Sequence, residues 1–237
     1  MIKKVAEASS SWMKPLHVGH VTVFTKEQDY QGNSRNYVMA SVLVPFSNLQ
    51  GCTCGVATSK ENRIVGGSEA GKHQYPWMIR LVAGGYCGGT LISSQYVLTA
   101  AHCVVSGGQI RPLSIFSVDL GEHDYSDSSA TRMSISEIIP YPKYMIDDDG
   151  NNRTSHVSHY DIAVLKLSSP VTFSQNIAPV CLPAHTMGNH AGKDAVATGW
   201  GVTETEHVSP VLKEANVTIL TNKACNEAYG ATDGMIR

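Results

Sequence analysis

From Ile64 onward, the sequence consists of short apolar runs, each bounded by glycine, proline or serine residues. WMIRLV, SIFSVDL, SISEIIP and DIAVLKL are examples of such runs. No convincing stretch of ten or more residues repeats its apolar side chains with the helical period. Short strands separated by turn-forming residues are typical of antiparallel β-sheet proteins. The pattern therefore predicts an all-β fold, a barrel or a sandwich, for residues 64–237.

The N-terminal part of the chain has a different texture. Residues 1–51 hold two strand-like stretches, at 21–24 and 37–46, with a polar segment between them. Residues 52–63 are small, polar and rich in turn formers, so we predict a linker there. We therefore expect an N-terminal auxiliary region, then a linker, and then the main β-domain over residues 64–237.

The composition argues against several classes of protein. Hydrophobic residues make up 42% of the chain and charged residues 16%, which indicates a globular rather than a disordered protein. The net charge is -2 and Lys and Arg form no cluster, which argues against nucleic acid or an anionic membrane as the main partner. No apolar run approaches the roughly 18 residues of a spanning helix, so we expect no membrane segment.

The cysteines and the glycosylation motifs predict an extracellular protein. The chain has six cysteines and no C-x-x-C pair that would suggest zinc, so we expect disulfide partners. The tripeptides that begin at Asn152 and Asn216 are both acceptors for N-glycosylation, which occurs only outside the cytosol. The first residues lack the apolar core of a secretory signal, so we expect the chain to be a piece of something longer.

The hexapeptide LTAAHC places His102 among small apolar residues. The preceding TLISSQYVLTA predicts two short strands, so His102 follows a strand end. Cys87 and Cys103 lie on either side of this hairpin, and a bridge between them would stabilise the fold by about 3 kcal/mol and fix the histidine backbone. His102 is then either a general base or a buried histidine that is hydrogen-bonded to a backbone carbonyl.

Two more residues bear on the chemistry. Asp161 stands immediately before the apolar run IAVLKL, and a carboxylate that enters a buried strand needs a cation or several hydrogen-bond donors. A histidine that takes up a proton would suit it, although spacing alone favours a turn residue at the strand start. Arg63 lies in the polar linker, and cleavage after it would free the amine of Ile64.

Seven motifs occur in one order along the chain: RIVGG, YPWMIRL, CGGTLISSQYVLTAAHC, LGEHD, DIAVLKL, APVCLP and ATGWG. This series resembles the chymotrypsin-like (S1, trypsin-like) serine proteases from Ile64 to Arg237. The resemblance implies two antiparallel six-stranded β-barrels and a secreted endopeptidase that works through an acyl-enzyme without a cofactor. Its partners would be protein or peptide substrates.

The resemblance also implies roles for single residues. His102 would be the general base and then the general acid, and Asp161 would orient it. The bond between Arg63 and Ile64 would be cut by an activating protease, which converts the zymogen to the active form.

For the cysteines, the resemblance implies two bridges, Cys87–Cys103 and Cys54–Cys181. Cys181 would tether the propeptide. Cys52 and Cys225 remain, and they would either find partners outside these residues or pair with each other.

The sequence departs from the family pattern in one block. The nucleophilic serine of the family lies in a GDSGGP segment, and the 237 residues contain none. We therefore expect an incomplete second barrel and no triad activity from the chain as written. It would be a fragment of an active endopeptidase; the alternative is a non-catalytic serine protease homologue with a regulatory or binding role.

CTCG also resembles the junction of arthropod-type proteases that carry a CUB module, of which residues 1–51 would be a remnant.

A metal site is not expected. Residues 121–132 occupy the place of the family's calcium loop, where Glu122 and Asp124 are weak candidates for oxygen ligands. Arg132 stands where the second ligating glutamate of the family would fall.

Overall fold

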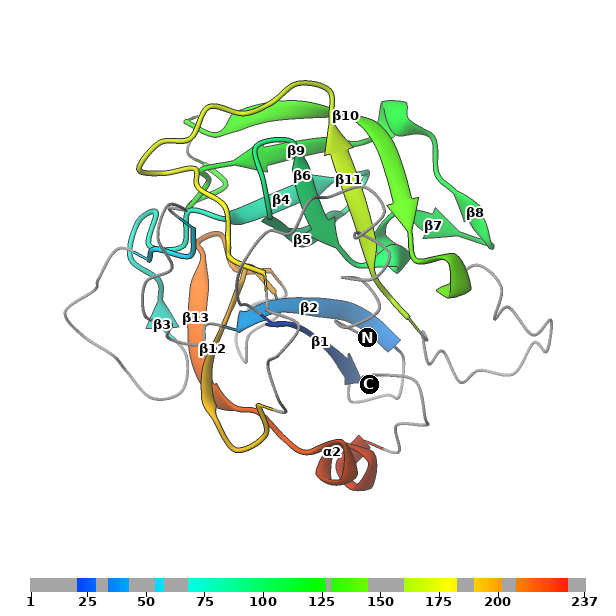
Figure 1. Cartoon of the computed structure of the whole chain (residues 1–237), viewed down its shortest axis with the longest axis vertical. Coiled ribbons are helices and arrows are strands. Elements are labelled where there is room, and N and C mark those ends of the chain that lie inside the picture. The colour runs from blue at the N-terminus through cyan, green and yellow to red at the C-terminus, as the bar shows by residue number, and fades with distance from the viewer. Residues whose placement is uncertain are drawn as a thin grey trace.

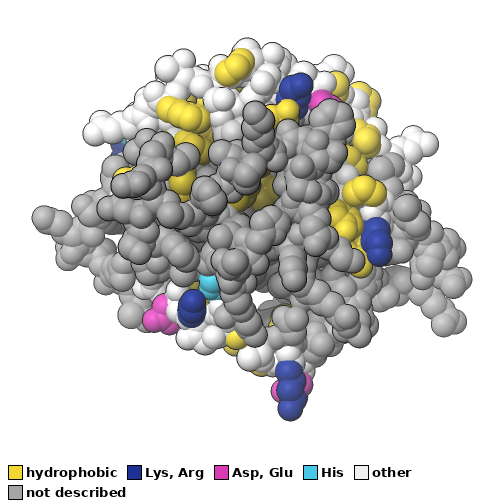
Figure 2. All heavy atoms as spheres, in the orientation of Figure 1, with side chains coloured by type: hydrophobic (Ala, Val, Ile, Leu, Met, Phe, Trp, Pro, Cys, Tyr) yellow, Lys and Arg dark blue, Asp and Glu magenta, His cyan; other side chains and the backbone are white. Residues whose placement is uncertain are grey.

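The computed structural model describes the following residues: 21–28, 34–42, 54–57, 68–126, 129–144, 160–182, 190–201 and 208–229. Strands dominate this part of the chain, which confirms the all-β prediction. No helix among these residues has the length and apolar character that crossing a membrane requires. On the face shown in Figure 2, the Lys and Arg side chains of the described residues stand apart from one another.

Six antiparallel strands close into a barrel in the upper half of Figure 1. Around the barrel they are β10 (Thr131–Pro140), β11 (Ala163–Leu167), β6 (Tyr96–Thr99), β5 (Tyr86–Leu91), β4 (Met78–Val82) and β9 (Ser117–Leu120). The side chains of β11 alternate between the buried interior and the half-buried outer face, as the strand period requires. The described core includes fully buried Ile79, Leu81 and Leu165.

One glycine allows two barrel strands to approach closely. A Cβ atom on Gly89 of β5 would lie 2.7 Å from Cδ1 of Ile79 and 2.9 Å from the backbone oxygen of Leu98. Both distances are shorter than van der Waals contact, so this position admits no side chain without a shift of β4 or β6.

A second, three-stranded sheet lies below the barrel in Figure 1. It contains β12 (Asp194–Gly199), β13 (Lys213–Thr218) and the two-residue β3 (Ser68–Glu69). β13 pairs with β12 along its whole length, but β3 covers only its first two residues. The two largest sheets of the described residues are thus one closed barrel and one open three-stranded sheet.

Trp200 joins the second sheet to the barrel. It follows β12 directly, and its indole N–H donates to the backbone oxygen of His123 over 3.1 Å. The same segment after β9 forms backbone hydrogen bonds to residues 210 and 212 ahead of β13. The two sheets are therefore fixed to each other by backbone contacts as well as by the shared core.

An N-terminal hairpin of β1 (Val21–Gln28) and β2 (Ser34–Val42) places β2 against β12 (Figure 1). The sequence predicted strands at 21–24 and 37–46. The strands extend further into the polar segment because backbone hydrogen bonds between paired strands do not require apolar side chains.

The remaining elements are short. They are the pair β7 (Val105–Ser106) and β8 (Gln109–Ile110), the 3₁₀ turns η1 (Ala101–Cys103), η2 (Leu113–Ile115) and η3 (Pro142–Tyr144), and helix α2 (Asn222–Tyr229). The apolar pattern did not predict α2, which has only eight residues. The hydroxyl of Thr221 caps it by accepting a hydrogen bond from the N–H of Ala224 over 3.0 Å.

Candidate active site

His102 lies in the turn η1, directly after strand β6 ends at Thr99. Its neighbours Ala101 and Cys103 are buried in the core, whereas its own side chain is 18% exposed. Cys103 forms a disulfide with Cys87 of β5, with an S–S distance of 2.01 Å. The turn is therefore fixed to the barrel on both sides of the ring, and the imidazole stands at the barrel surface.

Strand pairing brings the aspartate to this turn. β11 runs antiparallel to β6, with Ala163 opposite Thr99. Asp161 lies two residues before this pair and His102 lies three residues after it, so both leave the same end of the two strands. Residues that are 59 positions apart in sequence thus become neighbours.

The carboxylate of Asp161 makes two hydrogen bonds to His102. Oδ2 lies 2.6 Å from ring atom Nδ1, and Oδ1 accepts the backbone N–H of His102 over 2.8 Å. The aspartate side chain is 9% exposed, so water competes little for these bonds. Asp161 therefore bonds across the fold and does not merely begin a strand, and the partner of Nδ1 is a carboxylate and not a backbone carbonyl.

This geometry gives the two ring nitrogens different roles. The carboxylate holds the proton on Nδ1 and stabilises the ring when it becomes positively charged. Nε2 is then the nitrogen whose lone pair can accept a proton. It lies 3.4 Å from Sγ of Cys103, but the sulfurs of Cys87 and Cys103 are bonded to each other and offer no thiolate to a metal.

Most of the chain matches one known protein family. Residues 64–237 match the family model described as Trypsin. The chain belongs to the trypsin family. The trypsin-family region contains both His102 and Asp161, and it begins at Ile64, the residue after the predicted cleavage point.

Several curated relatives are similar to this trypsin-family chain. Venom serine protease 34 of Apis mellifera is 33% identical over an alignment of 189 residues, which covers 76% of this chain and 44% of that protein. The proclotting enzyme of Tachypleus tridentatus is 34% identical and matches 74% of this chain and 48% of its own length. The clotting factor G beta subunit of the same organism is 35% identical, with shares of 70% and 53%. The chain spans about half the length of these relatives.

A second disulfide in this trypsin-family chain joins Cys54 to Cys181, with an S–S distance of 2.04 Å. The N–H of Gly55 also donates to the backbone oxygen of Pro179 over 2.9 Å. Cys225 is a free thiol on α2. Arg63, Ile64, Asn152 and Cys52 lie outside the described residues, whereas Asn216 is exposed on β13.

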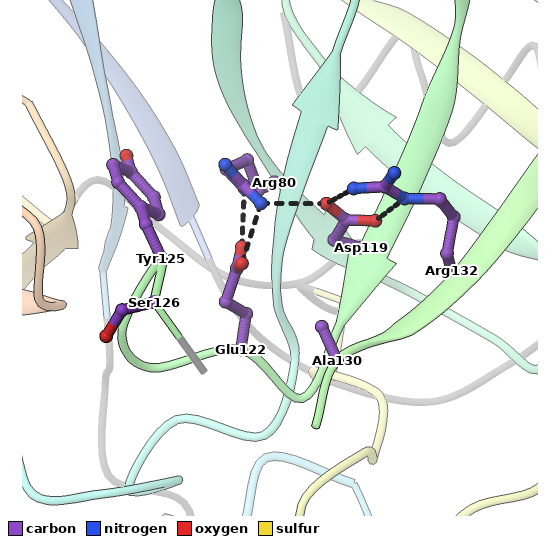
Figure 3. Close-up of a pocket in the computed structure, with 7 residues that line it drawn as sticks. All are labelled: Arg80, Asp119, Glu122, Tyr125, Ser126, Ala130 and Arg132. Carbon is purple, nitrogen blue, oxygen red and sulfur yellow. Dashed lines mark hydrogen bonds and ion pairs between the residues drawn. The ribbon is translucent and has the colours of Figure 1, made fainter. Parts of the chain in front are cut away.

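The two weak calcium candidates are engaged with other groups. Both carboxylate oxygens of Glu122 contact the buried guanidinium of Arg80, at 2.5 and 2.7 Å (Figure 3). Asp124 accepts two hydrogen bonds of 2.8 Å from Ser126, through the backbone N–H and the hydroxyl. A guanidinium thus occupies the position next to Glu122 that a divalent cation would need.

Arg80 belongs to a buried network that lines a pocket of about 280 Å³ (Figure 3). It donates to Oδ2 of Asp119 over 2.9 Å, and Arg132 binds the same carboxylate at 2.7 and 2.8 Å. Burial raises the pKa of Glu122, and the charge of Arg80 opposes this rise. Burial also raises the pKa of Tyr125, whose ring packs 4.5 Å from the Arg80 guanidinium.

Sequence reasoning did not identify the network around Arg80 or the unusual backbone of Tyr160. Arg80 was visible as the one charged residue in the run WMIRLV, where burial without a partner would be costly. Tyr160, next to Asp161, gave no signal because tyrosine rarely adopts the positive φ of 57° that it has here.

Proposed function

We propose that this chain carries the general base and the orienting carboxylate of a trypsin-like serine endopeptidase. The observation that supports it is the pair of hydrogen bonds that the Asp161 carboxylate accepts from the ring and the backbone N–H of His102, at 2.6 and 2.8 Å. A buried carboxylate that fixes the tautomer of a partly exposed imidazole is the arrangement that general-base catalysis requires.

In the proposed reaction, Nε2 of His102 takes the proton of a serine hydroxyl while the serine oxygen attacks the peptide carbonyl carbon. The same nitrogen then gives the proton to the leaving amine, and an acyl-enzyme remains. Nε2 then takes a proton from water as the water oxygen attacks the ester carbonyl, and it returns this proton to the serine oxygen when the bond to the acyl group breaks and the acid is released. The Asp161 carboxylate accepts the Nδ1–H hydrogen bond throughout and stabilises the imidazolium.

The serine is the part that these residues do not supply in the family's GDSGGP form. We propose that the 237-residue chain alone does not hydrolyse substrates by a triad, and that a longer polypeptide with this segment does.

Activation is proposed to follow cleavage between Arg63 and Ile64 by a protease that cuts after arginine. The Cys54–Cys181 disulfide would keep the residues before the cut attached to the domain. The division into an auxiliary region (1–51), a linker (52–63) and a peptidase domain (64–237) is part of the same proposal. One relative is named as a proclotting enzyme, which supports a zymogen with protein substrates and an activating protease.

We also propose that the protein is secreted and carries glycans on Asn152 and Asn216. The support comes from the two disulfides, the exposure of Asn216, and relatives whose names include venom and clotting proteins. Thiols of cytosolic proteins are kept reduced, so two disulfides favour an oxidising compartment.

The test uses the polypeptide extended past Arg237 to the serine, cut after Arg63, with an arginyl peptide amide as substrate. His102→Ala should lower kcat/KM by about 10⁵- to 10⁶-fold. The matched control is His190→Ala, which alters a partly exposed histidine just before β12. Activity within tenfold of wild type in His102→Ala would contradict the proposal, and glycine or alanine in place of the serine would support the non-catalytic homologue.

A further inference from the structure

The residue before Asp161 has an unusual backbone. Tyr160 has φ of 57°, and among the described residues His73 is the other non-glycine residue with positive φ. This left-handed conformation brings Cβ close to the following carbonyl oxygen, so a tyrosine adopts it only where surrounding contacts hold it. Glycine would take the same conformation without this cost, so the tyrosine ring must contribute something that glycine lacks.

The ring of Tyr160 is held by the segment that follows β10. It stacks on Tyr141, with ring centroids 5.0 Å apart and an interplanar angle of 16°. The ammonium of Lys143, in η3, lies 5.3 Å from the centre of the Tyr160 ring. Stacked and cation–π contacts of this kind favour one ring position over others.

The same segment also holds the residue after the aspartate. The N–H of Tyr141 donates to the carbonyl of Ile162 over 2.8 Å, and the N–H of Ile162 donates to the carbonyl of Tyr160 over 2.7 Å. Asp161 therefore lies between two residues that both contact Tyr141. Its backbone is fixed on both sides, although its own side chain points to His102.

We propose that Tyr160 is a positioning residue: its ring, held on Tyr141 and beside Lys143, maintains the left-handed turn that directs the Asp161 carboxylate to both donors of His102. The role in catalysis rests on the proposed function, but the role in geometry does not. A carboxylate that accepts two hydrogen bonds, from a ring and from a backbone N–H, tolerates little rotation of the aspartate. A turn that relaxed to negative φ at Tyr160 would rotate the following residue and break at least one of them.

The test compares Tyr160→Gly, which permits positive φ but has no ring to hold the turn there, with Tyr160→Phe, which keeps the ring. The readout is the proton NMR signal of the hydrogen-bonded Nδ1–H of His102 in the 237-residue chain. We expect the signal of Tyr160→Phe to match that of wild type. In Tyr160→Gly we expect the signal to shift upfield and the proton to exchange with water at least about tenfold faster than in wild type. His73→Gly is the matched control, because it changes the other positive-φ residue away from this turn and should leave the signal unchanged.

A wild-type signal and exchange rate in Tyr160→Gly would overturn the proposal. If that variant does not fold, Tyr141→Leu removes the stacking partner from the opposite side and must give the same change, and an unchanged signal there would equally overturn it. In the extended, activated polypeptide, Tyr160→Gly should lower kcat about 10- to 100-fold with KM unchanged, the size of effect that misplacement by about 1 Å produces. If His102→Ala retained activity while the NMR change appeared, the proposed function would fail and the positioning role would stand.

Discussion

Replacement of Arg80 by methionine probes the buried charge network. Methionine retains much of the apolar stem of arginine but removes the guanidinium, which is in contact with Glu122 at 2.5 and 2.7 Å and with Asp119 at 2.9 Å. The two carboxylates are then left in different situations. Asp119 keeps both hydrogen bonds to Arg132, whereas Glu122 loses its cation while its side chain is only 2% exposed.

The magnitude follows from this asymmetry. Breaking a buried ion pair by removal of one partner costs about 3–5 kcal/mol, because an uncompensated charge remains buried. Because Asp119 stays paired, we expect the lower end, about 3 kcal/mol at pH 7. For a domain of this size that loss corresponds to a fall in Tm of roughly 10 °C.

The cost of Arg80→Met should depend on pH. Burial raises the pKa of Glu122 and Arg80 opposes this, so the pKa rises further in the variant. A carboxyl whose pKa is higher in the folded than in the unfolded state favours folding at low pH and loses that contribution as pH rises through the folded value. The difference in the free energy of unfolding between variant and wild type should therefore shrink as the pH falls toward about 4, where Glu122 becomes protonated in both the folded and the unfolded state.

The assay is the free energy of unfolding by denaturant, for wild type and Arg80→Met, at pH 7 and at pH 4. Arg80→Met/Glu122→Leu is the matched double variant, and it should recover much of the loss because no unpaired charge remains. A loss below about 1 kcal/mol at pH 7, or one that is equal at both pH values, would refute the reasoning about this network.

Three further predictions follow from other contacts. Gly89→Ala should destabilise the barrel by about 1–3 kcal/mol through overpacking, whereas Gly85→Ala, with open space around its Cβ, should change the free energy of unfolding by less than about 0.5 kcal/mol; equal effects would contradict the packing argument. After cleavage at the activation bond, the N-terminal peptide of wild type should separate from the domain on gels only under reducing conditions, but the peptide of Cys54→Ser should separate without reduction. If the Cys54→Ser peptide stayed attached, the Cys54–Cys181 disulfide would not be what holds it. Because a guanidinium already binds Glu122, millimolar calcium should leave Tm unchanged. A clear rise in Tm would contradict the argument that Arg80 excludes calcium from Glu122.

The sequence allowed the fold class to be predicted, because apolar runs bounded by turn formers report strands directly. It was less informative where backbone pairing decides the structure. Polar residues of the N-terminal hairpin extend both strands through backbone pairing that continues past a register shift between Lys26 and Gln28, and no apolar pattern marks this. Helix α2 was missed because eight residues with one capping threonine are too short for a periodic signal.

For the site, the motif order predicted His102 and Asp161, but spacing alone favoured a turn residue at Asp161. The decisive fact is the register of β11 on β6, which places both residues at the same end of the barrel strands. Arg80 was visible as a charge in an apolar run, yet its carboxylate partners come from distant segments. Tyr160 could not have been found, since its role depends on a φ value that its residue type disfavours.

The most direct test of the central claim is the effect of Asp161→Asn on the extended, activated polypeptide. Asparagine preserves the size of the side chain but presents a different hydrogen-bonding pattern to Nδ1 of His102, so the ring adopts the wrong tautomer. If the two hydrogen bonds of 2.6 and 2.8 Å orient a catalytic base, kcat should fall about 10⁴-fold near neutral pH with KM little changed. A kcat within about tenfold of wild type would contradict the claim that this pair carries the catalysis.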